Sequence, residues 1–301
     1  MTGSWHDLRA DAVARLTAAG IGSAEAEARF LVEAASGFGP EEWPESAGTE
    51  PSARAAARLE VMLDRRTAGE PLQYVIGAWG FRALDLMVDS RVLIPRPETE
   101  VVVEVALAEA ERLGLRRATR SPVVAEGPPR AVLADLGTGS GAIAISLATE
   151  LADVEVWATD ASADALAVAA ANVAGCAATR VRLAPPGPWF AALPAALAGT
   201  LAVVVANPPY IAEAETVGLP AEVVDHEPRA ALVAGSRGTE ALEHLLTEGR
   251  AWVATPGALV LELAPHQAEE MADRARALGW VEIAVHPDLT GRARVLVARS
   301  G

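Results

Sequence analysis

The stretch that decides the fold is AVLADLGTGSG, residues 131–141. Its first five residues, Ala131 to Asp135, form an apolar run typical of a buried parallel strand, and residues 142–151 are good helix formers. A strand, a glycine turn and a helix in this order open a doubly wound α/β sheet, whose ligand binds at the carboxyl ends of the strands. The stretch therefore predicts a ligand site at the loop 136–141.

The glycine spacing and two acids narrow the ligand class. Gly137, Gly139 and Gly141 follow Gly-x-Gly-x-Gly and not the Gly-x-Gly-x-x-Gly of dinucleotide binders. Asp135, at the end of the strand, would repel a pyrophosphate but can engage the ammonium group of S-adenosylmethionine. Asp160 follows a second strand about 20 residues past the loop, where a carboxylate can accept both ribose hydroxyls. The alternative is that each acid only caps the turn after it.

A second motif, Asn207-Pro208-Pro209-Tyr210, directly follows the apolar run 201–206. Pro208 lacks an N–H and offers only its carbonyl oxygen, and Pro209 holds it extended. That carbonyl and the Asn207 amide oxygen suit a planar –NH2 group with two donors, and the ring of Tyr210 closes the site. Such a group occurs on glutamine and asparagine and on the amino edges of adenine and cytosine. The motif predicts a methyltransferase for an sp2 nitrogen without identifying which one.

Length and composition predict a soluble enzyme. The 301 residues exceed one average domain, and 51% hydrophobic with 22% charged residues provide an ample core. The single cysteine, Cys176, fits a reducing cytoplasm, and no apolar run reaches the roughly 18 residues that span a bilayer. The net charge of −15 favours a basic protein partner over free nucleic acid.

The first part of the chain is predicted to be helical. Apolar residues recur at helical spacing in three segments, residues 7–19, 23–36 and 52–68. They predict a small bundle over residues 1–73, whose expected use is partner recognition. Residues 74–95 are predicted as a hairpin-like linker, with Val75-Ile76 and residues 81–88 extended.

Residues 96–301 are predicted to form the catalytic domain. After a loop at 119–130 and the elements above, the remaining pattern predicts helices at 239–254 and 265–278 and strands at 257–263, 280–286 and 294–299. The last two strands are joined by a link too short for a parallel crossover, so they must pair antiparallel. We therefore expect a seven-stranded, mostly parallel sheet with one reversed terminal strand.

Together the two motifs resemble the HemK/PrmC family, the protein-(glutamine-N5) methyltransferases of peptide chain release factors. Other stretches that match the family are GEPLQY at 69–74, IPRPETE at 94–100, EPRAAL at 227–232 and Gly291-Arg292. The resemblance runs from about Gly69 to the end, and the helical N-terminal region matches in layout. It implies a class I S-adenosylmethionine-dependent methyltransferase fold, Rossmann-like, beside a small helical domain and a β-hairpin linker.

The resemblance also implies roles for single residues, and with the arguments above it completes the predicted site. The predicted donor-binding residues are Asp135, Gly137, Thr138, Gly139, Ser140, Gly141, Asp160, Trp189 and Asn207. The predicted substrate-binding residues are Arg96, Asn207, Pro208, Pro209 and Tyr210, of which Asn207, Pro208 and Tyr210 are also expected to be catalytic. Trp189 would pack near the adenine, with core filling as its alternative. The product would be S-adenosylhomocysteine, and no metal site is predicted.

Arg96 has two interpretations. It lies between Pro95 and Pro97, so its direction is fixed. It either contacts a ligand or substrate, or pairs with Glu98 or Glu100.

The implied substrate is the glutamine of the Gly-Gly-Gln loop of a release factor. The implied setting is cytoplasmic, with no direct contact to nucleic acid or membrane and a monomer favoured. One alternative is an adenine-N6 methyltransferase on DNA or RNA, which uses the same four-residue geometry. Another is a non-catalytic release-factor-binding paralogue, because the family usually has an acid where this chain has Pro188.

Overall fold

The computed structural model describes residues 3–39, 41–118 and 129–301. The chain divides into two compact units. The N-terminal unit comprises Met1–Ala78 and Pro220–His226, and the sheet unit comprises Trp79–Leu219 and Glu227–Gly301. The loop predicted at 119–130 lies, apart from its last two residues, outside the described part of the chain.

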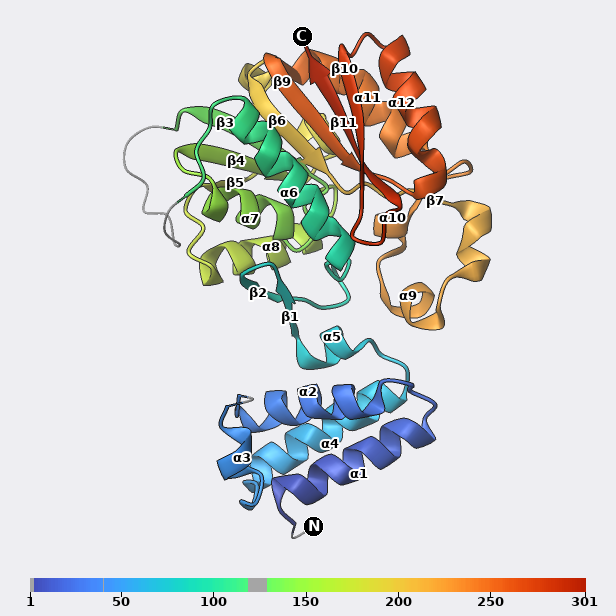
Figure 1. Ribbon diagram of the computed structural model, residues 1–301. Coiled ribbons are helices and arrows are strands. Elements are labelled where there is room, and N and C mark those ends of the chain that lie inside the picture. The colour runs from blue at the N-terminus through green and yellow to red at the C-terminus, as the bar shows by residue number, and fades with distance from the viewer. Residues whose placement is uncertain (1–2, 40, 119–128) are drawn as a thin grey trace. The chain divides into compact units, whose positions relative to one another are not determined.

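The N-terminal unit is a bundle of helices, drawn mainly in blue in Figure 1. Its helices are α1 (Trp5–Ala18), α2 (Ala24–Ser36), α3 (Trp43–Ser46), α4 (Ala53–Thr67), α5 (Leu72–Ile76) and α9 (Ala221–His226). The apolar faces of α1, α2 and α4 share one core, in which Leu16, Leu31 and Leu59 are fully buried. The three predicted long helices are confirmed within one or two residues at each end.

The hairpin begins later than its sequence pattern predicts. Val75-Ile76 belongs to α5, so the prediction of an extended segment there is wrong. The helical turn buries Leu72 and Val75 in the core of the N-terminal unit, and this burial outweighs the β preference of the branched side chains. Gly77 ends α5 with a φ of +82°, which glycine adopts readily. The hairpin then consists of β1 (Ala78–Phe81) and β2 (Leu84–Met87).

The sheet unit is built on a sheet that has seven strands within the described residues. These are β3 (Ala131–Leu136), β4 (Val154–Thr159), β5 (Val181–Leu183), β6 (Leu201–Ala206), β9 (Val253–Glu262), β10 (Glu282–Pro287) and β11 (Ala293–Ser300). Their order across the sheet is β10-β11-β9-β6-β3-β4-β5. Among these seven described strands, β11 alone runs against its neighbours, β10 and β9, as the short link before it requires. The predicted sheet with one reversed terminal strand is confirmed.

The strand order reverses between β3 and β6. From β3 the chain proceeds outward to β4 and β5, and then returns to place β6 on the other side of β3. Neighbouring strands whose connections leave in opposite directions open a crevice at their carboxyl ends. The glycine loop follows β3 and the Asn-Pro-Pro-Tyr motif follows β6, so both motifs lie at this crevice.

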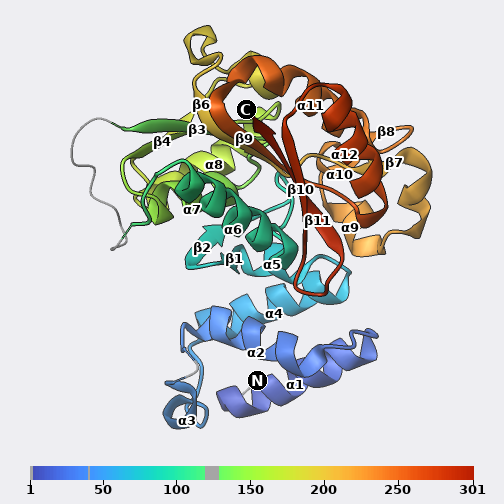
Figure 2. The same cartoon turned by 45° about the horizontal axis from the view of Figure 1, so that its top comes forward.

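Helices cover both faces of the sheet (Figures 1 and 2). One face carries α6 (Pro97–Arg112), α7 (Ala142–Glu150) and α8 (Ala163–Gly175), and the other carries α11 (Glu240–Trp252) and α12 (Ala268–Ala277). Successive strand residues point to opposite faces, so Leu133 and Val205 enter the first core while Ala134 and Val204 enter the second. Burial on both faces explains why these strands are continuously apolar.

Short elements complete the sheet unit. They are η1 (Trp189–Ala192), η2 (Ala195–Leu197), β7 (Ile211–Ala212), η3 (Glu213–Gly218), α10 (Arg229–Leu232), β8 (Val233–Gly235) and η4 (Pro265–Gln267). The small parallel pair of β7 and β8, which the sequence pattern does not reveal, lies just after the Asn-Pro-Pro-Tyr motif. In residues 3–39, 41–118 and 129–301, no helix combines the length and apolar character that crossing a membrane requires.

Candidate active site

The glycine loop forms one wall of the crevice. Gly137, Gly139 and Gly141 all have left-handed backbones, with φ of +76°, +54° and +86°. The N–H groups of Gly137 and Thr138 donate to the carbonyl of Thr159, at 2.9 and 2.8 Å, and tie the loop to the end of β4. A Cβ atom on Gly137 would lie 3.2 Å from the ring of Trp189. The loop therefore needs glycine both for its backbone and for the close approach of that ring.

Asp160 joins this wall from the end of β4. Its Oδ2 accepts a hydrogen bond from the Gly139 N–H at 3.0 Å, and its Oδ1 accepts one from the Ser162 N–H at 2.9 Å. Each carboxylate oxygen can accept two hydrogen bonds, so capacity remains on both for a ligand hydroxyl pair. Asp160 is thus held in place by two backbone contacts and lines the cavity at this wall.

Asp135 lies behind the loop. It is fully buried, and its Oδ2 accepts hydrogen bonds from Thr138 Oγ1 at 2.6 Å and from the Ala144 N–H at 3.0 Å. Among the described residues Oδ1 has no hydrogen-bond partner. Burial raises the pKa of this carboxyl to about 7. Asp135 holds the loop to the start of α7, and its predicted contact with a ligand ammonium stays a prediction.

The crevice contains a cavity of about 310 Å³, a size that fits a small-molecule ligand. Of the predicted site residues, its lining brings together Arg96, Gly137, Thr138, Gly139, Ser140, Asp160, Trp189, Asn207 and Pro209. Among the described residues the remaining predicted members, Asp135, Gly141, Pro208 and Tyr210, do not line it.

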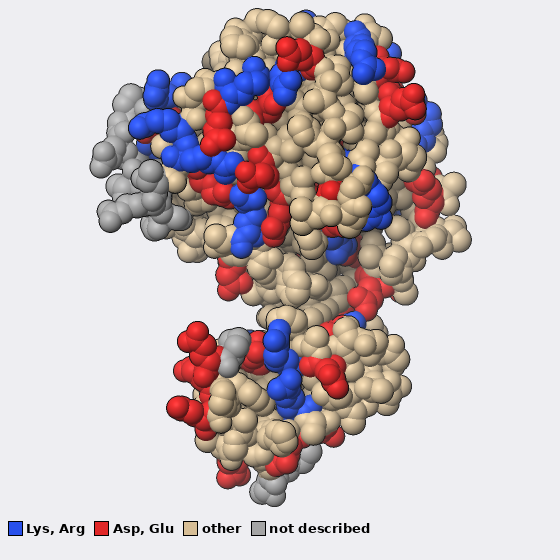
Figure 3. Space-filling view, in the orientation of Figure 1, with Lys and Arg blue, Asp and Glu red and all other residues tan. Residues whose placement is uncertain are grey.

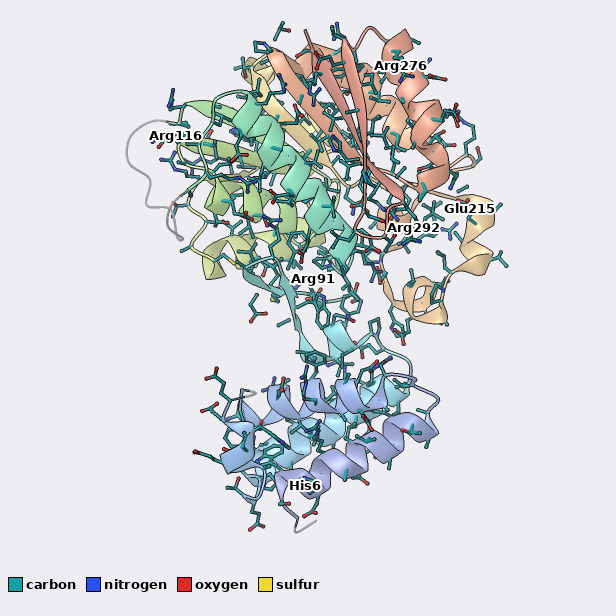
Figure 4. All side chains as sticks on the ribbon, in the orientation of Figure 1. His6, Arg91, Arg116, Glu215, Arg276 and Arg292 are labelled. Atoms are coloured by element: carbon teal, nitrogen blue, oxygen red, sulfur yellow. The ribbon has the colours of Figure 1, made fainter. Side chains whose placement is uncertain are left out.

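Several lining residues were missed as individual site residues. They include Arg91, Thr99, Pro228 and Ala231. Arg91, labelled in Figure 4, lies on the segment between β2 and α6 and pairs with Asp89 at 2.6 Å. Thr99 and Pro228 fall inside the two proline-containing stretches that carry the family resemblance, and that was the available signal.

Trp189 and Phe190 separate into two roles. Trp189 lines the cavity and has a φ of +44°, an uncommon backbone for a bulky residue. Phe190 is fully buried and stacks on Trp252 with ring centroids 5.5 Å apart. Phe190 therefore anchors η1 in the core while Trp189 faces the cavity over Gly137.

Asn207 enters the cavity from the end of β6. Its Nδ2 donates to Thr99 Oγ1 at 3.1 Å, and Thr99 Oγ1 donates to Glu262 Oε2 at 2.8 Å. Glu262 is 1% exposed, and its Oε1 accepts a hydrogen bond from the Tyr210 hydroxyl at 3.4 Å. The asparagine is therefore connected through α6 to a buried carboxylate on β9.

Tyr210 is held at both its hydroxyl and its backbone. Burial, and next the charge of Glu262, raise the pKa of this phenol to about 12, so it stays protonated. Its carbonyl accepts a hydrogen bond from Gln267 Nε2 at 2.9 Å. Gln267 is also buried and donates to the Gly238 carbonyl at 3.0 Å, so it fastens two loops together.

Gly238 offers a test of this packing. Its φ is +79°, and a Cβ there would lie 2.7 Å from the Tyr210 carbonyl oxygen and 2.9 Å from the Ala212 nitrogen. Gly238→Ala must therefore displace the loop that follows Asn207. We expect it to slow catalysis by roughly tenfold or more, because small misplacements of positioning groups are costly. Steady-state rates and thermal unfolding measure the two effects.

Gly279→Ala is the matched control for that variant. Gly279 has a similar φ of +84° but open space at its Cβ. An alanine at this position therefore introduces only the strain of a left-handed backbone, about 1–2 kcal/mol, and no steric clash. We expect the free energy of unfolding to fall further in Gly238→Ala than in Gly279→Ala, and only Gly238→Ala to lose activity. Equal effects of the two substitutions would contradict the packing role of Gly238.

Arg96 has a partner that its sequence neighbourhood does not contain. It lines the cavity, and its Nη2 donates to Glu227 Oε1, 131 residues further along the chain. The prediction of a pair with Glu98 or Glu100 is therefore wrong. Glu100 instead accepts a hydrogen bond from the Arg82 N–H at 2.9 Å. Because the Glu227 side chain is 2% exposed, the ion pair fixes the guanidinium at the cavity wall.

The N-terminal unit has a cavity of its own, of about 460 Å³, which is lined in part by residues 19–23. Arg66, which lines it, already pairs with Glu27 at 2.6 Å and with Glu222 at 2.7 Å. This cavity is lined by neither the loop 136–141 nor Asn207, both of which border the crevice, so the chemistry is assigned to the sheet unit.

Comparisons with known proteins agree with this geometry. Residues 7–77 match the model described as PrmC N-terminal domain, and residues 124–236 match the methyltransferase small domain. The release factor glutamine methyltransferase of Deinococcus radiodurans is 38% identical over 294 residues, 98% of each chain. That of Moorella thermoacetica is 40% identical over 290 residues, 96% of this chain and 95% of the other. The solved catalytic domain of hMettl16, in complex with an RNA hairpin, has a TM-score of 0.55 at 12% identity, covers 89% of this chain and 92% of its own, and shows the shared fold alone.

Proposed function

Since the chain belongs to the release factor glutamine methyltransferase family, we propose that its substrate is the Gly-Gly-Gln glutamine of a peptide chain release factor. The reaction transfers a methyl group from S-adenosylmethionine to the side-chain amide nitrogen and leaves S-adenosylhomocysteine. The observation that carries this assignment is the position of Asn207 in the same cavity as the glycine loop and Asp160.

The cavity fits the donor. When bound, S-adenosylmethionine supplies a methyl group on a positively charged sulfur. Gly137 to Ser140 provide a wall without side-chain bulk at its two glycines, and Asp160 has free acceptor capacity for the ribose hydroxyls. Trp189 provides an aromatic face for the adenine. Asp135 supports this site through Thr138, and Gly141 supports it by its left-handed turn into α7.

Asn207 and Pro208 orient the acceptor nitrogen. An amide nitrogen is a poor nucleophile because its lone pair is delocalised into the carbonyl. Two hydrogen bonds, to Asn207 Oδ1 and to the Pro208 carbonyl, would turn the nitrogen toward the methyl group and favour the positive charge that develops on it. Alignment of this kind contributes roughly 7–11 kcal/mol to a reaction barrier. Pro209 keeps Pro208 extended, and Tyr210 would flank the flat amide.

No strong general base is needed in this scheme, because the proton can leave the nitrogen after transfer. The guanidinium of Arg96, fixed by Glu227, borders the same cavity and would contact the peptide backbone beside the glutamine. Arg96 is therefore proposed as a substrate contact.

The negative charge of the protein argues against the alternative of an adenine-N6 methyltransferase. The net charge is −15, and Figure 3 shows arginines beside acidic residues over α6, where Arg82 and Arg117 both pair with Glu104. Proteins that grip nucleic acid neutralise several phosphates with unpaired cations. We therefore propose a protein partner, with no direct contact to nucleic acid or membrane.

The division of labour follows the chain. We assign partner recognition to the helical region 1–73, a linker role to residues 74–95 and catalysis to residues 96–301. The match of residues 7–77 to the PrmC N-terminal domain supports the first assignment. We further propose that the protein acts as a monomer in the cytoplasm, where release factors meet the ribosome.

Incubation with isotope-labelled S-adenosylmethionine, a purified release factor and an oligonucleotide tests the proposal. Mass mapping should place the label on the glutamine of the Gly-Gly-Gln loop. Label on adenine would establish the nucleic-acid alternative. Calorimetric titration with the donor addresses the non-catalytic alternative, because the absence of heat at millimolar donor would support it.

A further inference from the structure

The hydroxyl of Thr99 lies between the side chains of Asn207 and Glu262. Thr99 Oγ1 is 2.8 Å from Glu262 Oε2 and 3.1 Å from Asn207 Nδ2. Thr99 and Glu262 are only 4% and 1% exposed, so bulk water does not compete for the contact between them, whereas the contact to Asn207 is part-buried at the cavity. A hydroxyl has one proton to donate, and an ionised carboxylate can only accept. Thr99 therefore donates its one hydrogen bond to Glu262 and accepts the hydrogen bond from Asn207 Nδ2 with a lone pair.

This direction decides which end of the Asn207 amide faces the cavity. Only Nδ2 can donate to the lone pair of Thr99, so Oδ1 is the end left for the cavity that Asn207 lines. The reversed amide would place Oδ1 against Thr99 Oγ1, two acceptors without a proton between them. A glutamine –NH2 group has two donors, so it needs Oδ1 in the cavity.

We propose that Glu262 and Thr99 form a positioning relay that holds the Asn207 amide with Oδ1 toward the substrate nitrogen. This inference rests on the proposed function, which makes Oδ1 the acceptor for the glutamine. Glu262 and Thr99 act through Asn207 and are positioning residues. The second oxygen of Glu262 accepts a hydrogen bond from the Tyr210 hydroxyl at 3.4 Å. The same carboxylate therefore contacts Tyr210 directly and Asn207 through Thr99.

The relay has its direction only while Glu262 is ionised. Burial raises the pKa of Glu262 to about 7, and Glu98 adds to this, while the hydrogen bonds from Thr99 and Tyr210 and the charge of Arg294 oppose it. A protonated Glu262 can donate to Thr99, whose own proton then faces Asn207 and favours the reversed amide. We therefore expect kcat to fall as the pH drops through about 7.

Thr99→Val and Thr99→Ser form a matched pair for the relay. Valine keeps the shape of threonine without the hydroxyl, and serine keeps the hydroxyl. We expect Thr99→Val to lower kcat roughly 100-fold, with the release-factor KM and the donor Kd changed by less than about threefold. Thr99→Ser should recover kcat to within about fivefold of the wild type. Wild-type kcat in Thr99→Val would overturn the relay.

The pH profile and a double variant separate the relay from general damage. The acid limb of kcat should persist in Thr99→Ser and vanish in Thr99→Val, because protonation of Glu262 no longer reaches Asn207. Asp135 also has a pKa of about 7, and a limb that persists in Thr99→Val would belong to it instead. Glu262→Gln can donate from its amide to Thr99, so it should slow kcat roughly tenfold or more.

In the double variant Thr99→Val with Glu262→Gln, the relay is already broken by the first substitution. Glutamine keeps an amide oxygen that can accept from the Tyr210 hydroxyl, so the kcat of the double variant should equal that of Thr99→Val alone, whereas independent sites would multiply their losses. Multiplied losses would therefore overturn the relay. A wild-type protein that methylates no glutamine would refute the proposed function itself, which is a different outcome from an active wild type with an active Thr99→Val.

Discussion

Asn207→Ala is expected to lower kcat for glutamine methylation by about 10³-fold while the donor Kd stays within about threefold of the wild type. The substitution removes the only side-chain oxygen of the Asn-Pro-Pro-Tyr motif that lines the cavity within the described residues. Without it, one N–H of the substrate amide loses its acceptor, and the nitrogen is free to rotate away from the methyl group. The glycine loop and Asp160 remain, so the donor should still bind.

Two measurements make this result interpretable. Calorimetric donor binding by Asn207→Ala tests whether the fold and the donor site survive, and single-turnover transfer to a release factor measures the rate of the chemical step. Asn207→Gln keeps the amide but extends it by one methylene, so it should also be slow if geometry is what matters. A kcat for Asn207→Ala within tenfold of the wild type would remove Asn207 from the mechanism.

Asp160→Ala is expected to raise the Kd for the donor roughly 100-fold, because hydrogen bonds to a charged group contribute about 1.5–3 kcal/mol each. The carboxylate does two things: it would accept the ribose hydroxyls, and it holds the Gly139 and Ser162 N–H groups. Both are lost in alanine. With saturating donor, kcat should recover to within about tenfold of the wild type, since the acceptor side is untouched.

Asp164→Ala is the matched control for Asp160→Ala. Asp164 is exposed in the first turn of α8, four residues along, and does not line the cavity. Asp164→Ala removes one negative charge near the site, as Asp160→Ala does, without removing a contact in the cavity. The two variants should therefore differ in donor Kd by nearly the full effect, as calorimetry can measure. Equal affinities would show that Asp160 only caps the turn.

Local patterns were sufficient for the fold of the sheet unit. The apolar run before Asp135 and the glycine loop after it predict β3 and the turn into α7, and the short link after residue 286 predicts the reversed β11. These features depend on neighbours in the sequence, so one chain contains the information. Val75-Ile76 shows the limit, because the core that makes it helical comes from distant helices.

Side-chain pairs across the site could not be predicted in the same way. Arg96 pairs with Glu227 across 131 residues, and Thr99 with Glu262 across 163. Several acids near Arg96 satisfied the same electrostatic reasoning, and only the folded chain selects one of them. Glu262 itself ends an ordinary apolar strand pattern, so nothing local distinguishes it from a surface acid.

The buried acids of the sheet unit couple folding to proton uptake. Asp135 and Glu262 have ordinary pKa values of 3.8 and 4.5, and burial raises both to about 7 in the folded protein. Between these limits the native state keeps protons that the unfolded chain has released, so the free energy of unfolding declines as the pH rises. Above pH 7 both carboxyls are ionised in the native state as well. The stabilisation that they provide at low pH, on the order of several kcal/mol for the two groups, is then lost completely. Because the relay needs an ionised Glu262, the pH range in which these two carboxyls contribute most to stability lies below the range in which we expect the protein to be most active.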